Sequence, residues 1–589
     1  DTAYPYRQQN GYTRELVDRK VKTAVLENKY LKAVFLPEYG GRLWRLWDKE
    51  AKRDLLYTND VLRFSNLALR NAWFSGGVEW NIGMIGHTPL TTEPLYTART
   101  KTEKGDPVLR MYEYERVRKV VYQMDFWLEK RSRFLNCRMR IVNESKAVIP
   151  MYWWSNIAVP EYEEGRVTVP AEHAFTNRDG MVYKVPVPVV KGKDITEYKN
   201  IDTSVDYFFD IPEKSPKYIM NVDKTGYGLF HISTRRLGSR KLFSWGNSDG
   251  SHRWQEFLTD QAGRYLEVQA GLAKTQYGCI PMAPHTAWEW MEQYGAVQLP
   301  EEIREQNPEE RSRFVTDKIR RKRTWSRLEK KLGETRTMAK TEAELIWQGK
   351  GYAAVQTHEK NVSHLEFRME DKGLKDWKNF FETGVLHCPD ALEAPDEFMI
   401  DEGNLEFLEE SIAEKNSGNW YAYYHLGIGY YVSGKYKKAK KAFKKSLELR
   451  ENPWACHGLG CLYLISGKKE KSAEYILRGM RIRGGDISYL KEGFRILYLC
   501  GEYKKLCSLY KELDKEIRTV NRIRFYYICS LHRLGMDEKA YRLLEKNGGM
   551  ELEDIREGED SIGQLWSELY ESLHGKTKKV PHKYNFKSV

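Results

Sequence analysis

The sequence predicts an all-β sandwich over residues 1–300 and an all-α array of helix pairs over residues 417–575. Three observations support this division. Short strand patterns follow one another from residue 20, no long amphipathic helix interrupts them, and near the C-terminus a glycine recurs every 33 or 34 residues. With 589 residues, 41% hydrophobic and 30% charged, the chain is long enough for several soluble domains.

The sandwich is predicted from segments rich in Val, Tyr, Phe and Trp that turn residues separate. A parallel α/β fold would need a helix between successive strands, and none is visible here, so antiparallel sheets are expected. The clearest strands are expected at 21–26, 31–36, 108–114, 120–128, 133–142, 228–232, 265–270 and 286–291.

The sequence changes in character after Pro300. Residues 301–416 are charge-dense, with a basic run at 320–323, and are expected to form solvated helices that link the two domains. The last segment, 576–589, is a basic tail more like an arm than a terminal cap.

Helix pairs are predicted beyond residue 420 by regular spacings. Trp420 and Trp454 lie 34 residues apart, and glycines recur at 434, 467, 501 and 535. The first unit resembles the tetratricopeptide repeat, a helix–turn–helix of about 34 residues. The resemblance implies that Gly427 and Ala439 let two helices approach closely, while Tyr430 and Phe443 fill the space between repeats. Such arrays commonly bind a protein partner or a second copy of the chain.

Composition argues against several classes of function. The net charge of +13 is spread along the chain, with 43 Lys and Arg against 36 Asp and Glu in residues 1–300, so no basic face for nucleic acid is expected. No apolar run approaches the roughly 20 residues of a membrane helix. Eight cysteines without a C-x-x-C pair favour reduced thiols and a cytoplasmic protein. No metal-ligand spacing or phosphate loop is visible in the sequence, so neither metal nor cofactor is expected.

The first candidate for chemistry is the segment 72–89. It places Glu79, Asn81 and His87 close after the Gly76-Gly77 turn. If the segment is extended, Glu79 and Asn81 share one face with Trp80 on the other. A carboxylate beside aromatic side chains is suited to acid/base work on a sugar, although Glu79 could equally cap a turn and His87 could be an ordinary loop histidine.

Two later segments add polar and aromatic candidates. Residues 151–156 supply Trp154 and Asn156, and tryptophan rings stack on the C–H faces of sugars, although each could instead pack in the core. In the expected strand 265–270, Glu267 and Gln269 share one face between apolar neighbours.

These segments, in this order, resemble a galactose-mutarotase-like domain. The turn Gly40-Gly41-Arg42 resembles the opening of such domains, and Leu266-Glu267-Val268-Gln269 matches the context in which they place a general-base Glu. A second register, on Thr275-Gln276, would put Lys274 at that position. Together with the repeats, the chain is similar to a family of mutarotase-like supersandwich domains followed by tetratricopeptide repeats, known chiefly as a domain of unknown function. The resemblance implies carbohydrate chemistry without selecting the reaction.

Three functions therefore stay open at this point. The first is a glycoside hydrolase with a Trp-lined cleft, in which Glu79 and Glu267 lie less than about 10 Å apart and act as acid and base or nucleophile. The second is an aldose epimerase with Glu267 as base and His87 as acid. The third is a non-catalytic sugar-binding scaffold whose repeats recruit a partner. The residues expected to bind the carbohydrate are Arg42, Trp80, Asn81, Trp154, Asn156, Trp245, Gln269, Gln276 and Glu292.

Overall fold

The computed structural model describes residues 4–588 except 71, 84 and 356–361, and the chain divides into two compact units. The β unit comprises Glu15–Met369 with Phe586–Val589, and the helical unit comprises Asp1–Arg14 with Glu370–Asn585. The division near residue 369 lies well beyond the boundary expected at Pro300, because the helices that follow Pro300 pack on the β unit.

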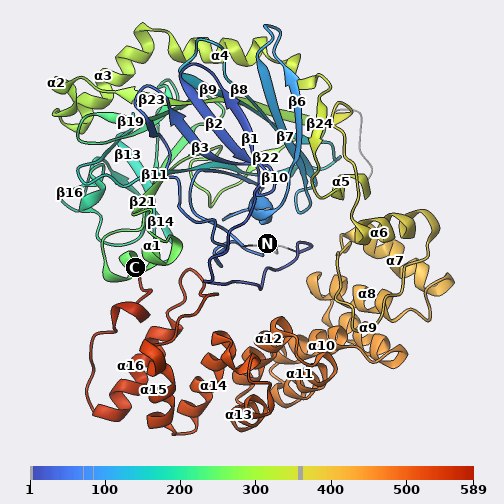
Figure 1. Cartoon of the computed structure of the whole chain (residues 1–589). Helices are drawn as coiled ribbons and strands as arrows, with labels where there is room; N and C mark the ends of the chain where they lie inside the picture. Colours follow the sequence, from blue (N-terminus) through green and yellow to red (C-terminus); the bar gives the residue numbers. More distant parts are fainter. Residues whose placement is uncertain (1–3, 71, 84, 356–361, 589) are drawn as a thin grey trace. The chain divides into compact units, whose positions relative to one another are not determined.

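The first sheet of the β unit is antiparallel (Figure 1). Its strands include most of the predicted candidate residues. Its central strands, β5, β11, β21 and β20, come from distant parts of the chain. In spatial order its strands are β1 (Ala24–Glu27), β2 (Leu31–Leu36), β3 (Arg42–Asp48) with β4 (Arg53–Asp54) at its side, β5 (Val78–Ile82), β11 (Trp153–Pro160), β21 (Tyr265–Gly271), β20 (Ser239–Ser244), β17 (Val205–Phe209), β13 (His173–Arg178) and β14 (Met181–Pro186).

The second sheet is also antiparallel and is built mainly of consecutive hairpins. Its strands, again in spatial order, are β12 (Arg166–Thr168), β18 (Lys217–Val222), β19 (Tyr227–Ser233), β23 (Thr286–Gln298), β9 (Phe134–Asn143), β8 (Val120–Trp127), β7 (Pro107–Glu115), β6 (Tyr96–Lys101) and β24 (Glu344–Trp347). Two small pairs complete the strands, β10 (Ile149–Met151) with β22 (Ile280–Met282), and β15 (Val189–Val190) with β16 (Lys193–Asp194).

The two sheets pack through their inner faces, as the alternation of the sequence predicts. Phe35 and Trp80 of the first sheet both contact Phe126 of the second, at 4.7 and 5.4 Å between ring centroids. Trp153 packs edge-to-face on Trp290. Among the described residues of 20–300, the one α-helix is the short α1 (Asp249–Leu258), so the predicted all-β class is confirmed.

The helices after Pro300 cover the second sheet instead of linking two domains. Val315, Ile319 and Leu328 are buried against a cluster that includes Tyr218 and Met291 of that sheet. Burial of these apolar side chains explains why the segment belongs to the β unit. The helices are α2 (Glu301–Arg304), α3 (Pro308–Arg321), α4 (Thr324–Glu334) and α5 (Tyr352–Val355).

The helical unit is a series of antiparallel helix pairs (Figure 1). Glycines 434, 467, 501 and 535 follow α8, α10, α12 and α14 with φ of +71°, +71°, +81° and +74°. Glycine adopts this left-handed conformation without strain, which explains the 33- and 34-residue spacing. The helices are α6 (Lys372–Thr383), α7 (Glu402–Glu414), α8 (Trp420–Val432), α9 (Tyr436–Leu449), α10 (Pro453–Ile465), α11 (Lys469–Arg483), α12 (Ile487–Cys500), α13 (Tyr503–Glu512), α14 (Asn521–Arg533), α15 (Asp537–Glu545) and α16 (Ser561–His574).

The interior of the first repeat has the expected packing. A Cβ added at Gly427 would lie 2.4 Å from the ring of Phe443, so only glycine fits there. Phe443 and Ala439 are completely buried, and Tyr430 is 6% exposed. The tetratricopeptide geometry is therefore confirmed at the residues that predict it.

Described residues near both ends of the chain are held by packing. Arg7 forms an ion pair with Asp396 in the helical unit. Tyr584 is buried in the same unit, while Phe586 packs on Trp254 of the β unit, 5.0 Å between centroids. Within the basic tail, which was expected to be an arm, Tyr584 and Phe586 are thus anchored by packing. None of the described helices has both the length and the apolar character needed to cross a bilayer.

Candidate active site

Four neighbouring strands bring a row of polar side chains together on the outer face of the first sheet. Glu79 of β5 lies opposite Asn156 of β11, and Asn156 lies opposite Gln269 of β21. Gln269 in turn lies opposite Lys241 of β20. Glu267 is two residues from Gln269 and therefore shares this face. The sheet thus places the two predicted carboxylates on one face, with a single strand between theirs.

The neighbouring residues on the same strands point into the sandwich. Trp80 donates its indole N–H to the carbonyl of Gly41 at 3.0 Å and packs against Phe126. Alternation along the strand requires this, because Glu79 and Asn81 face outward. Trp80 is therefore a core residue, and its expected role in substrate binding is wrong.

Glu79 is a buried carboxylate surrounded by hydrogen-bond donors. Both of its oxygens lie 3.0 Å from Nδ1 of His87, and Trp73 donates its indole N–H at 2.9 Å. Asn156 donates from Nδ2 at 3.3 Å. Burial opposes ionisation, but His87, nearby Arg42 and the Trp73 N–H together lower the pKa of Glu79 to about 2. Glu79 is thus a carboxylate whose main contact is the imidazole of His87.

Aromatic rings lie on two sides of His87. Its centroid is 5.2 Å from that of Trp73 and 5.2 Å from that of Trp154. The indole N–H of Trp154 and the side-chain oxygen of Asn156 have no hydrogen-bond partner within the described part of the chain. A buried donor and a buried acceptor without partners are costly unless a ligand binds them, so both are suited to hydroxyl groups.

Asn81 and Arg42 hold the loop that carries His87. The side-chain oxygen of Asn81 accepts the backbone N–H of Thr88 at 2.8 Å. Arg42 is 2% exposed and donates to the carbonyls of Phe74 and Gly76 and to the hydroxyl of Thr91, at 2.8–2.9 Å. The structure therefore gives both residues positioning roles. Their contacts with substrate stay predictions, and Nδ2 of Asn81 has no hydrogen-bond partner within the described residues.

Glu267 has fewer hydrogen-bond donors around its carboxyl group than Glu79 has. It is 5% exposed and accepts a hydrogen bond from the amide nitrogen Nε2 of Gln269 at 2.9 Å. Burial raises the pKa of Glu267 to about 7, against the lowering influence of His87 and Lys241, while Glu79 adds to the rise. Near neutral pH this carboxyl can both take up and release a proton. We call the group the carboxylate cluster: Glu79, His87, Trp154, Asn156, Lys241, Glu267 and Gln269.

Lys241 is a member of the cluster that the sequence interpretation missed. Its ammonium lies 2.7 Å from Asp206, 3.4 Å from the side-chain oxygen of Gln276 and 5.7 Å from the Trp154 ring centroid. One sequence feature could have indicated Lys241: it lies between Arg240 and Leu242 on a strand, so alternation places its side chain on the face opposite that of Leu242. Gln276 thus lies beside the cluster. Lys274, the alternative base position, pairs instead with Asp210 and is largely exposed.

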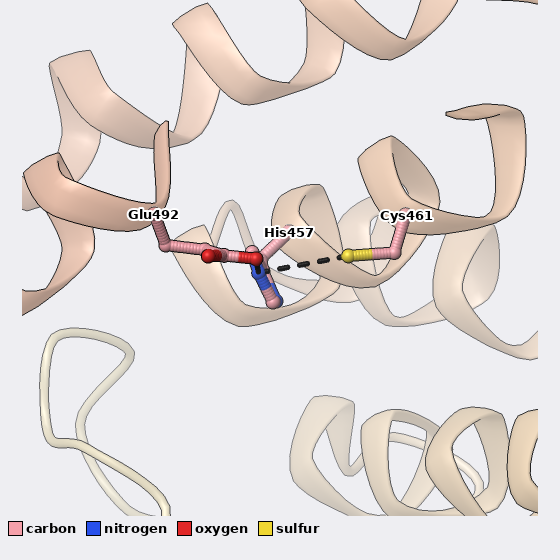
Figure 2. A group of neighbouring side chains, drawn as sticks. All are labelled: His457, Cys461 and Glu492. Carbon is pink, nitrogen blue, oxygen red and sulfur yellow. Dashed lines mark hydrogen bonds and ion pairs between the residues drawn. The ribbon is translucent and has the colours of Figure 1, made fainter. Parts of the chain in front are cut away.

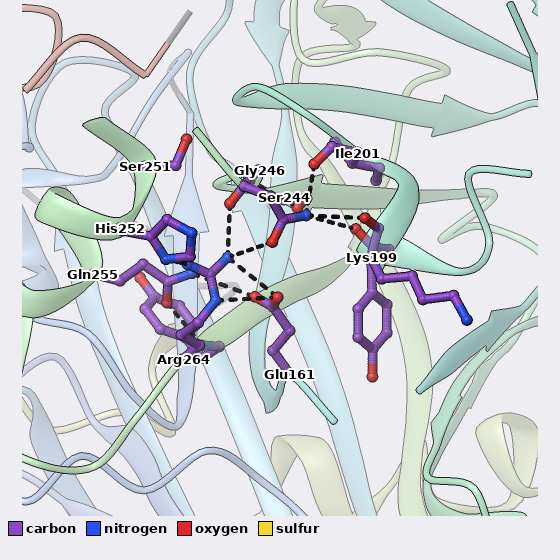
Figure 3. Close-up of polar contacts among 12 residues, drawn as sticks. Glu161, Lys199, Ile201, Ser244, Gly246, Ser251, His252, Gln255 and Arg264 are labelled. Atoms are coloured by element: carbon purple, nitrogen blue, oxygen red, sulfur yellow. Dashed lines mark hydrogen bonds and ion pairs between the residues drawn. The ribbon is translucent and has the colours of Figure 1, made fainter. Parts of the chain in front are cut away.

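Arg264 fixes the ends of the strands that carry the cluster (Figure 3). Its guanidinium donates to Glu161, just after β11, at 3.2 Å and to the carbonyl of Gly246, just after β20, at 2.7 Å. It also contacts Nδ1 of His252 on α1 at 2.6 Å. Because Arg264 immediately precedes β21, these bonds hold the three strands in register beside Glu267.

Two further candidates lie elsewhere. Trp245 stacks on Trp254 of α1, 6.0 Å between centroids, and is 1% exposed, so it anchors that helix. Glu292 is fully buried between the sheets, where its oxygens accept hydrogen bonds from residues of both sheets: Ser155, His231, Trp290 and Tyr294. Both were expected to bind substrate, and both instead serve packing of the interior.

The fold and the cluster together define a class of protein: a two-sheet antiparallel sandwich with an acid–imidazole group on its outer sheet face, joined to a helical repeat array. Two family models match within the chain. Residues 1–286 match the family described as a domain of unknown function, DUF5107, and residues 420–453 match the tetratricopeptide repeat. The chain thus carries a DUF5107 domain and a tetratricopeptide repeat.

Solved structures similar to this chain differ in how much of it they match. A tetratricopeptide-repeat-containing protein from Parabacteroides distasonis is 17% identical with a TM-score of 0.71, and the match covers 99% of this chain and 92% of that one, which shows a common fold. A galactose mutarotase-like protein from Clostridium acetobutylicum is 9% identical over 49% of this chain and 99% of its own, with a TM-score of 0.37. A structure described as a putative aldose 1-epimerase from Escherichia coli is 12% identical over 48% and 100%, with a TM-score of 0.34.

Proposed function

We propose that the β unit is a carbohydrate-active enzyme that interconverts the anomers of an aldose, with Glu267 and His87 as its proton-transfer pair. The observation that carries this proposal is the unequal state of the two carboxylates. Glu79 is ionised and contacts His87, Trp73 and Asn156, whereas Glu267 accepts a hydrogen bond from Gln269 and has a pKa of about 7. A group that titrates near the working pH is the better proton carrier.

The chemistry requires only two proton transfers and no cofactor. Ionised Glu267 accepts the proton of the anomeric hydroxyl while His87, through Nε2, protonates the ring oxygen. The bond between the anomeric carbon and the ring oxygen then breaks, and an open-chain aldehyde forms. Rotation about the adjacent C–C bond presents the other face of the aldehyde, and the reverse transfers close the ring. Glu79 orients His87 through Nδ1 and stabilises its charged form.

The substrate is a single sugar unit in this proposal. The Trp154 indole can lie against a pyranose face, and Asn156, Gln269 and Lys241 can bind adjacent hydroxyls. The direct test follows the exchange between anomers of a panel of aldoses by NMR, with and without protein. Accelerated exchange of one or a few sugars is expected, and exchange at the spontaneous rate for every aldose would contradict the proposal.

Glycoside hydrolysis is the second candidate, and one observation favours it. Two carboxyls on one sheet face with pKa values of about 2 and about 7 are suited to act as nucleophile and acid. The same preparation should therefore be tested on aryl glycosides and oligosaccharides, with the anomer of the first product assigned by NMR. Hydrolysis without anomer exchange would select this candidate over the first.

We propose that the repeats form a protein-binding region. The faces of such arrays commonly bind a peptide or another chain. In this structure the chain's own N-terminal segment already lies on the helical unit, where Lys491 of α12 contacts the carbonyl of Asn10. We therefore expect a partner or a second copy to compete with residues 4–14. Light scattering and pull-down experiments that compare the full chain with one lacking these residues test this.

A further inference from the structure

Three side chains in the helical unit converge on one point that the proposed activity does not use (Figure 2). His457 and Cys461 are four residues apart on α10 and therefore project from one side of that helix. Glu492 projects from α12, the first helix of the next pair. The imidazole, the sulfur and the carboxylate bring ligand atoms within 4.8 Å of one another.

The distances within this group leave His457 without a short hydrogen bond to Glu492. The same ring nitrogen, Nε2 of His457, faces both the sulfur of Cys461 and a carboxylate oxygen of Glu492, at 3.6 Å each. An N–H···O hydrogen bond has a length of about 2.7–3.2 Å, and one N–H that is shared between two acceptors bonds each of them less strongly. The nitrogen thus faces the space between a sulfur and a carboxylate oxygen, and its contact with the carboxylate is longer than a hydrogen bond.

A tetrahedral zinc ion accounts for these separations. With Zn–N and Zn–O bonds of about 2.0–2.2 Å and a Zn–S bond of about 2.3 Å, neighbouring ligand atoms in a tetrahedron lie roughly 3.3–3.7 Å apart. The two measured separations of 3.6 Å match this range. A nitrogen, a thiolate sulfur and a carboxylate oxygen also form a donor set that zinc accepts readily.

From this we infer that His457, Cys461 and Glu492 form a zinc-binding site that joins α10 to α12, with a fourth position for water or an external ligand. Arg495 supports the site from outside. It binds both oxygens of Glu492, at 2.7 and 2.8 Å, which holds the carboxylate in place and leaves lone pairs for the metal. The side chains of His457 and Glu492 are 38% and 35% exposed, so a metal ion can reach them.

The site has a mechanical consequence for the repeat array. Its ligands come from the first helices of two successive pairs, whose contacts hold the array together. A bound ion adds a cross-link between these helices that exists only in the folded unit, and binding to the folded state alone raises stability. Zinc should therefore stiffen the array at this junction independently of any chemistry in the β unit.

The test uses the full chain, freed of metal by a chelator and titrated with Co²⁺, which reports zinc sites by its colour. We expect one equivalent to bind with a near-ultraviolet thiolate-to-cobalt charge-transfer band and visible bands typical of tetrahedral Co²⁺, and Zn²⁺ to abolish both. Zn²⁺ should also raise the melting temperature of the chelator-treated protein.

Variants assign the ligands. Cys461→Ser should remove the charge-transfer band, and Glu492→Gln should keep the band but weaken Co²⁺ binding at least about tenfold. Cys500→Ser changes a thiol of α12 that is not part of the proposed site, so this matched control should bind Co²⁺ as the original protein does. Circular dichroism checks that each variant folds. Absence of the charge-transfer band in the unaltered protein, or its persistence in Cys461→Ser, would overturn the assignment.

Discussion

Nδ1 of His87 lies 3.0 Å from each carboxylate oxygen of Glu79, so a partly exposed imidazole and a buried carboxylate form one pair on the outer face of the first sheet. The pair links a loop to a central strand, and Trp73 and Asn156 complete the shell of donors around the carboxylate. Within the proposed function this makes Glu79 a positioning residue and leaves proton transfer to His87 and Glu267.

Replacement of Glu267 by Gln should abolish most of the activity. Loss of a general base commonly lowers turnover by at least about 10²-fold, and Gln keeps the shape of the side chain. In the unaltered protein the rate should rise with pH through about 7, the pKa of Glu267, because the ionised form is the base. Anomer-exchange rates measured by NMR between pH 5 and 9 check both expectations; full activity in Glu267→Gln would remove the residue from the mechanism.

The same substitution should change how stability depends on pH. The folded-state pKa of Glu267 is raised above 4.5, so its favourable contribution is present below that pH and is lost as pH rises through about 7. Relative to Glu267→Gln, the original protein should therefore lose on the order of 3 kcal/mol between pH 5 and pH 8. Melting curves of both proteins at several pH values measure this difference, and parallel curves would show that Glu267 ionises freely.

Replacement of Glu79 by Gln distinguishes the two candidate reactions. If Glu79 positions His87, the variant should retain part of its anomer exchange, and the limb of the pH profile that belongs to His87 should move to lower pH because the imidazolium loses its carboxylate partner. Glu79→Asp, which keeps the charge, should restore the profile in part. A two-carboxylate hydrolase would instead lose at least about 10²-fold in hydrolysis with Glu79→Gln.

Two adjacent tryptophans offer a matched comparison of binding with packing. Trp154 faces the carboxylate cluster, so Trp154→Phe should raise KM several-fold with little change in melting temperature. Trp153 faces the interior and packs on Trp290, so Trp153→Phe should cost about 1–3 kcal/mol of stability and leave KM unchanged. The reverse assignment of the two effects would contradict the strand alternation described here.

Glu292 should matter for folding and not for substrate. Its carboxylate accepts four hydrogen bonds between the sheets, and Glu292→Ala would leave those buried donors without a partner. We expect a loss of at least about 3 kcal/mol of stability. The fraction that stays folded at low temperature should show the KM of the original protein, and a raised KM in that fraction would return Glu292 to the site.

The sequence by itself determined the two fold classes and most strand positions. Local signals were sufficient: β2 lies at the predicted residues 31–36, and the repeat glycines lie at helix ends where only a left-handed backbone fits. Alternation also placed Glu79, Asn81, Glu267 and Gln269 on the correct side of their strands. Each of these properties depends on residues close together in the chain.

Tertiary structure alone decided which of those side chains meet. Glu79 and Gln269 are 190 residues apart in number and become neighbours of Asn156 only because β11 lies between their strands. Strand order places Lys241 in the cluster, and sheet stacking places Glu292 in the interior instead. No local pattern in the sequence encodes either property. His457 and Glu492 likewise converge because two helix pairs pack side by side. Periodicity fixes the face of a strand or helix, whereas long-range packing fixes what that face contacts.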